Sequence, residues 1–94
     1  MGKYSNMKMC SGFKIVTIVD EHLVVPVGET AITFKGVVAL SEAAYFLLNT
    51  LQEPKSKDDL LNSLIEEFEI DEETAREDID KFINQLLLLG VIEE

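Results

Sequence analysis

The chain has 94 residues, close to the length of one small domain, and this length predicts a single core without a second catalytic domain. Its hydrophobic content of 47% is enough to fill that core and disfavours a disordered chain. The formal net charge of −10 at pH 7 disfavours binding to phosphate backbones and to anionic lipid surfaces.

Cysteine content and hydropathy predict a cytoplasmic protein. Cys10 is the one cysteine, so no intramolecular disulfide can form. No apolar run approaches the roughly 18 to 20 residues of a membrane span, and no signal-peptide core is recognisable near the first residue. We therefore expect no membrane partner. Residues 1–12 are expected to form a flexible arm, followed by a single domain over residues 13–94.

The segment between residues 13 and 40 is rich in β-branched side chains, which are typical of strands. One strand is predicted over Ile15–Val19 and a second over Leu23–Val25, with residues 20–22 as the turn between them. Residues 31–34 and 37–40 flank Lys35-Gly36 and predict a tight hairpin, because glycine can take the positive φ that such a turn needs. These segments together predict a small antiparallel sheet.

From Ser41 onward the apolar residues follow the period of a helix, and three helices are predicted. Ser41 caps the first helix, which ends at Pro54, and Ser56 caps the second. Asp71 or one of its neighbours caps the third, which ends at Gly90. The chain is thus predicted to be an α+β domain, a small N-terminal antiparallel sheet followed by a three-helix bundle, and similar in outline to a winged helix-turn-helix.

Apolar side chains on each predicted helix share one face, which indicates a common core. Tyr45 and Phe46 lie off that face on the first helix, and Leu88 lies off it on the third. We interpret Tyr45 and Phe46 as packing against the sheet, with an exposed binding surface as the alternative. The residues predicted to face the core are Leu40, Ala44, Leu47, Leu48, Leu51, Leu60, Leu61, Leu64, Ile65, Phe68, Ala75, Ile79, Phe82, Ile83, Leu86, Leu87 and Leu89.

The sequence contains no recognisable set of catalytic or metal-binding residues. His22 is the only histidine and falls in a predicted turn, and nothing near Cys10 apart from scattered lysines would activate its thiol. The acids between residues 66 and 73 lack the alternating ligands and the central glycine of a calcium-binding loop, and they are interpreted as a solvated face. We therefore expect no enzymatic activity, no metal and no other cofactor.

A sheet followed by three helices also raises the possibility of a DNA-binding or regulatory protein. The predicted third helix carries only two basic residues, Arg76 and Lys81, among a clear majority of acidic ones. A helix that reads DNA usually brings several lysine or arginine side chains to the phosphates. DNA binding is therefore retained only as the alternative, and no nucleic-acid partner is expected.

Four stretches of the sequence together resemble a known family. They are HLVVPVGETA at residues 22–31, FKGVVALSEAA at residues 34–44, LLNTL at residues 47–51, and EDIDKFINQL at residues 77–86 with Gly90-Val-Ile after it. In their order and spacing, these stretches are similar to the PqqD family of peptide chaperones, over about residues 13 to 93. Two positions depart from the expected pattern, because Lys35 and Ser41 stand where asparagine is expected.

The resemblance implies a non-catalytic chaperone, or precursor-peptide recognition element, of the kind named after pyrroloquinoline quinone biosynthesis. Such a protein binds the leader segment of a ribosomally made precursor peptide and presents it to a modifying enzyme, often a radical S-adenosylmethionine enzyme. In the family the leader adds as a strand beside the strand that runs into the first helix, and the last helix completes the groove. The matching positions here are Val37, Val38, Ala39, Leu40, Asp78, Phe82 and Leu86. Periodicity alone also marks Phe82 and Leu86 as core residues.

Overall fold

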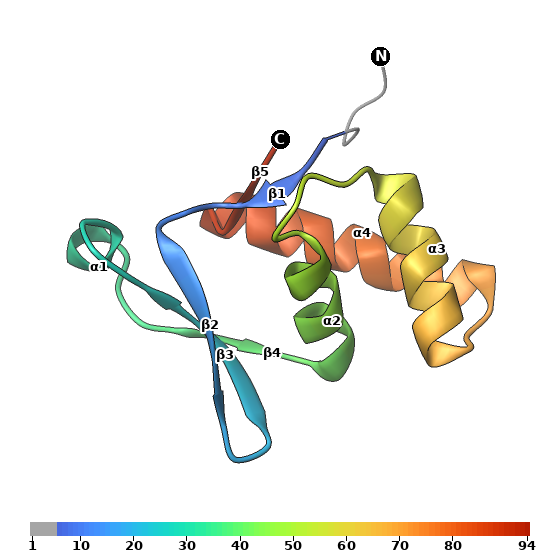
Figure 1. Ribbon diagram of the computed structural model, residues 1–94, viewed down its shortest axis with the longest axis horizontal. Coiled ribbons are helices and arrows are strands. Elements are labelled where there is room, and N and C mark those ends of the chain that lie inside the picture. Colours follow the sequence, from blue (N-terminus) through green and yellow to red (C-terminus); the bar gives the residue numbers. More distant parts are fainter. Residues whose placement is uncertain (1–5) are drawn as a thin grey trace.

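A computed structural model describes residues 6–94, and in it a three-stranded antiparallel sheet extends to one side of the helices (Figure 1). The strand order is β2 (Phe13–Ile18), β3 (Glu21–Pro26) and β4 (Val38–Leu40). Val24 on β3 lies opposite Val38 on β4 and is completely buried. The predicted N-terminal antiparallel sheet followed by helices is confirmed.

The predicted hairpin around Lys35-Gly36 is wrong. Thr30–Thr33 form one helical turn, α1, and the chain then passes through Gly36 into β4. Gly36 has a φ of +98°, a conformation that a residue with a Cβ rarely adopts. β4 pairs with β3 and not with residues 31–34, so the strand partner is distant in sequence.

The turn between β2 and β3 is also shorter than predicted. Only Val19 and Asp20 separate the two strands, because Ile18 pairs directly with Glu21. His22 therefore belongs to β3, where it lies opposite Leu40 of β4, and it is not a turn residue.

Three long helices follow the sheet, as predicted. They are α2 (Glu42–Thr50), α3 (Lys57–Phe68) and α4 (Glu72–Leu89). α2 ends at Thr50, before the predicted limit at Pro54, because Leu51 leaves the helical conformation, with a φ of −83° and a ψ of 11°. Within residues 6–94 no helix is both long and apolar enough to cross a membrane.

The predicted helix caps are confirmed. Ser41 Oγ accepts a hydrogen bond from the Ala44 N–H at 3.1 Å. Asp71 accepts one from the Thr74 N–H, and hydrogen bonding by Thr74 lowers the pKa of Asp71 below its ordinary value. Gly90 ends α4 with a φ of +79°. Local sequence signals therefore set most of the helix limits.

Removal of the Ser56 hydroxyl is expected to destabilise α3. Ser56 Oγ accepts from the Asp59 N–H at 3.1 Å, and the Asp59 carboxylate accepts from the Ser56 N–H at 3.2 Å, so the two residues form a reciprocal cap. We expect Ser56→Ala to lower the free energy of unfolding by about 1 kcal/mol, measured by urea denaturation. Ser63→Ala, which removes a hydroxyl from the middle of the same helix, is the control and is expected to change stability little. Equal effects of the two substitutions would contradict a role for the cap.

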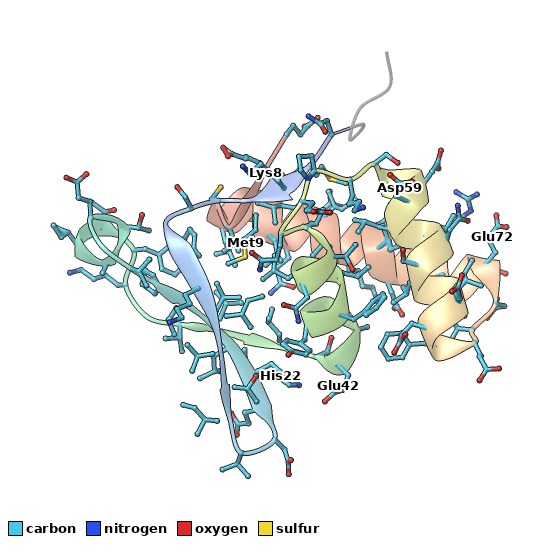
Figure 2. All side chains as sticks on the ribbon, viewed as in Figure 1. Lys8, Met9, His22, Glu42, Asp59 and Glu72 are labelled. Atoms are coloured by element: carbon cyan, nitrogen blue, oxygen red, sulfur yellow. The ribbon has the colours of Figure 1, made fainter. Side chains whose placement is uncertain are left out.

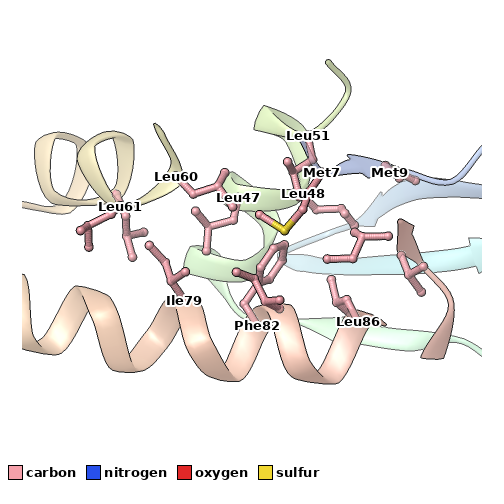
Figure 3. Packing of buried hydrophobic residues seen from close by; sticks show 14 of the residues in the cluster. Met7, Met9, Leu47, Leu48, Leu51, Leu60, Leu61, Ile79, Phe82 and Leu86 are labelled. Carbon is pink, nitrogen blue, oxygen red and sulfur yellow. The ribbon is translucent and has the colours of Figure 1, made fainter. Parts of the chain in front are cut away.

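The core lies between the helices and is closed by both terminal strands (Figure 3). Leu47, Leu48 and Leu51 belong to the same buried cluster as the apolar side chains of α4, and α3 adds Leu60, Leu61 and Leu64 to it. Leu88 is 88% exposed, as its position on the predicted helix indicated. The buried core residues are Met7, Met9, Val24, Leu47, Leu48, Leu51, Leu60, Leu61, Leu64, Ala75, Ile79, Phe82, Ile83, Leu86, Val91 and Ile92.

The segment just before β2 is part of the fold, and the expectation of a flexible arm is wrong for residues 7–10. β1 (Lys8–Met9) pairs with β5 (Ile92–Glu93). Met7 exchanges two backbone hydrogen bonds of 2.8 Å with Lys55, and its side chain is completely buried. Residues 1–5 of the expected arm lie outside the described residues. That residues 13–94 alone form the domain stays a prediction.

Candidate functional site

β4 is an edge strand, and this makes it the first component of the candidate site. β4 pairs with β3 along one side, and no described strand pairs with its other side. Val38 and Leu40 are half-buried and pack against the core, whereas Ala39 is exposed on the opposite face of the sheet. The preceding residue, Val37, is 56% exposed and lies outside the strand. The free side of β4 is therefore available to an added strand.

The backbone geometry of an edge strand determines what it can bind. In an antiparallel sheet, the N–H and C=O of one residue point together toward one neighbouring strand, and those of the next residue point the other way. Some backbone groups of β4 thus bond to β3 and the others point away from the sheet. An extended peptide can pair with these outward groups with little demand on its own sequence.

A groove between α2 and α4 begins where β4 ends. Its volume is about 450 Å³, and Ser41, the residue directly after β4, is part of its wall. α2 contributes Ala43, Ala44 and Leu47, and the two alanines leave the space open because their side chains are short. α4 contributes four residues from consecutive turns of one face, Asp78, Lys81, Phe82 and Gln85.

The groove has an apolar floor and a charged rim. Phe82 is 5% exposed and Leu47 is 1% exposed, so both belong to the core as well as to the groove. Asp78 is half-buried, and Lys81 is exposed. Within residues 6–94 neither charge takes part in an ion pair, so both can bind groups of a ligand. The groove can hold apolar side chains in its floor and polar or charged groups at its rim.

The structure brings most of the predicted site residues to this region. Asp78 and Phe82 line the groove, and Val38–Leu40 form the strand that leads into it. Leu86 does not line the groove: it is 2% exposed and lies in the core.

Sequence reasoning missed the residues that shape the groove. Lys81 and Gln85 lie one and two turns after Asp78 on the same face, and this helical spacing could have indicated them. Ala43 and Ala44 gave no comparable indication in the sequence, because a small side chain leaves space for a groove only where another helix faces it, and that helix is known only from the structure.

α2, which forms one side of the groove, is held against the sheet by a contact with β3 (Figure 2). The His22 ring stacks on the Tyr45 ring with 3.6 Å between centroids and an angle of 6°. His22 Nε2 lies 3.3 Å from a Glu42 carboxylate oxygen, and His22 Nδ1 lies 2.9 Å from Thr17 Oγ1. Tyr45 thus packs against the sheet, as interpreted from the sequence, whereas Phe46 packs against Phe68 of α3. These contacts hold the first turn of α2 against the sheet.

The groups considered above for catalysis are dispersed. Within residues 6–94 no three His, Cys, Asp or Glu side chains come together in a way that could hold a metal ion. Burial raises the pKa of the Cys10 thiol, Glu93 raises it further, and Lys8 partly offsets both. A thiol with a raised pKa carries little thiolate at neutral pH and is a poor nucleophile.

Comparisons with known proteins identify a family and a shared fold. The family model described as coenzyme PQQ synthesis protein D, or PqqD, matches residues 16–92. Among solved structures, the chain is similar to one described as TbiB1 in complex with the TbiA(beta) leader peptide. The TM-score is 0.72 at 17% sequence identity, and the match covers 92% of this chain and 94% of that chain, so the two share the fold. Comparison with curated proteins gave no match.

Proposed function

The chain belongs to the PqqD family of non-catalytic peptide-binding proteins, and from this premise we propose that it binds the leader segment of a ribosomally made precursor peptide and presents that peptide to a modifying enzyme. The observation that carries the proposal is the continuity of the free edge of β4 with the groove between α2 and α4. A single extended peptide can use both features at once.

In this proposal the leader lies beside β4 as a fourth strand of the sheet. Its backbone pairs with the outward groups of Val37–Leu40, and this pairing supplies affinity. Side chains of a strand alternate between two faces, so every second leader residue is directed toward the groove side. Phe82 and the two alanines of α2 receive an apolar leader side chain, and Asp78 receives a basic group or an amide. Leu86 supports this surface from the core.

The proposal extends to the partner and the compartment. We propose a radical S-adenosylmethionine enzyme as the modifying partner, in the biosynthesis of pyrroloquinoline quinone or of another peptide product, because the family is named after that pathway. We propose a cytoplasmic location, where ribosomes release precursor peptides. The unpaired Cys10 is compatible with a reducing compartment.

A titration of isotope-labelled protein with a synthetic leader tests the proposal. The leader would be taken from a short precursor peptide found by searching the genes that flank the gene of this chain. Amide shifts are expected at residues 37–41 and at Asp78, Lys81, Phe82 and Gln85, because these residues form the edge and the groove. A DNA duplex at low salt serves as the comparison and is expected to leave the spectrum unchanged. Shifts confined to α3, or binding of the duplex instead of the leader, would overturn the proposal.

Asp78→Ala is expected to weaken leader binding without unfolding the protein. The carboxylate is half-buried at the rim of the groove and has no ion-pair partner within residues 6–94. Loss of a desolvated partner costs about 1 to 3 kcal/mol of binding free energy, measured by calorimetric titration with the leader. Glu77→Ala removes an exposed carboxylate that is on the same helix but outside the groove and in no ion pair within residues 6–94, and it is the control. Equal affinities for the two variants would place the leader elsewhere.

A further inference from the structure

A second groove lies on the other side of α2, between α2 and α3, and its volume is about 390 Å³. The residues of α2 that line it are Glu42, Tyr45, Phe46, Asn49 and Thr50, and none of these lines the groove toward α4. The two grooves therefore use separate faces of one helix, so that both can be occupied at the same time.

Aromatic rings form the apolar part of this second groove. Phe46 and Phe68 meet edge to face with 5.6 Å between centroids, and Phe68 is 37% exposed at the end of α3. Tyr45 is held in place by its stack on His22. Aromatic rings fixed in this way attract a cation to their faces.

Carboxylates lie next to these rings. Glu42 lines the groove from α2 and Glu67 lines it from α3, and both are exposed. Glu42 faces His22, whereas no ion pair within residues 6–94 includes Glu67. An anionic group beside aromatic faces suits a planar, permanently charged guanidinium, because it can stack on a ring and donate two parallel hydrogen bonds to one carboxylate.

We propose that the groove between α2 and α3 binds an arginine side chain in a basic segment of the modifying enzyme, while the leader occupies the edge of β4 and the groove toward α4. This proposal rests on the proposed function, because presenting a leader requires a surface that the leader leaves uncovered. Charge complementarity favours a basic partner, since the two charged side chains that line this groove, Glu42 and Glu67, are both acids and no basic side chain lines it.

The test uses acetyl-arginine amide as the probe, with acetyl-citrulline amide as its neutral counterpart of almost the same shape. We expect the arginine probe, titrated into isotope-labelled full-length protein, to shift the amides of Tyr45, Phe46, Glu67 and Phe68 and to leave Asp78 and Phe82 unchanged. Glu67→Gln and Phe68→Ala are expected to weaken probe binding at least about threefold. Glu73→Gln, which removes the same charge outside the groove, is the matched control and is expected to bind like the wild type.

A second titration separates this proposal from the leader-binding proposal. Protein saturated with the leader peptide is expected to bind the arginine probe with unchanged affinity. Equal shifts with citrulline, shifts spread over all acidic residues, or loss of probe binding in the presence of the leader would overturn the second site. Arginine binding at this groove in a protein that binds no leader would contradict the leader proposal instead. Finally, Glu67→Gln is expected to lower affinity for a modifying enzyme found by searching the genes that flank the gene of this chain, and an unchanged affinity would overturn the assignment of that enzyme as the partner.

Discussion

Proline at one of two neighbouring positions of β4 is expected to weaken leader binding about tenfold or more while the protein stays folded. Val38 and Ala39 are consecutive strand residues, so the N–H of one points to β3 and the N–H of the other points to the free side. Proline lacks this N–H. Of Val38→Pro and Ala39→Pro, one therefore removes a donor to the leader, and the other removes a donor to β3.

The two variants are expected to differ in both affinity and stability. The variant with proline at the position whose N–H points to the free side is expected to bind the leader about tenfold or more weakly, because the substitution interrupts the main-chain pairing that supplies most of the affinity. The melting temperature of this variant stays close to that of the wild type. The variant with proline at the position whose N–H points to β3 is expected to have a lower melting temperature, because it loses a hydrogen bond within the sheet. Calorimetric titration and thermal unfolding of both variants measure these effects. Ala39→Val keeps the N–H and is the control. Wild-type affinity in both proline variants would show that the leader does not pair with β4.

Met7→Ala is expected to lower the free energy of unfolding by about 2 to 5 kcal/mol. Met7 is completely buried beside residues of α2, and Figure 3 shows its side chain close to Leu48 and Leu51. Truncation leaves a cavity that is not readily filled, because the N–H and the C=O of Met7 both hydrogen-bond to Lys55 and fix this segment in place.

Chemical denaturation followed by circular dichroism measures this effect. Lys8→Ala is the matched control, because Lys8 is the exposed neighbour on the same segment, and it is expected to change stability by less than about 0.5 kcal/mol. Equal stability of the two variants would mean that residues 7–9 add nothing to the core, as expected of a flexible arm.

The sequence predicted those parts of the fold that depend on neighbouring residues. Ser41, Ser56 and Asp71 cap helices through hydrogen bonds to residues three positions away, and Gly90 ends α4 with its own backbone conformation. Such signals are contained within a few residues, so they could be recognised without knowing the fold.

The errors concern contacts between distant segments. The strand β4 pairs with β3, and the local alternation around Lys35-Gly36 could not reveal that the preceding residues would form a helical turn. Met7 appeared to belong to an arm because its partners, Lys55 and the core beneath it, lie far along the chain.

In the candidate site, too, residues could be predicted where local sequence identifies them, and not where their role depends on contacts between distant segments. Asp78 and Phe82 could be named from the sequence because their helix and its resemblance to the family were recognisable. Ala43 and Ala44 could not, because the groove that they line depends on the angle at which α2 crosses α4.

The pairing of β1 with β5 has a consequence for the order in which the protein folds. These strands come from the two ends of the described chain, whereas the turns of α3 and α4 depend on contacts only a few residues apart. Contacts between distant residues carry a larger loop-closure entropy and form late. We therefore expect the part of the core that contains Met7 and Val91 to form last. During synthesis, we expect the side chain of Met7 to stay exposed until β5 has left the ribosome, because its neighbours in the core are completed only then.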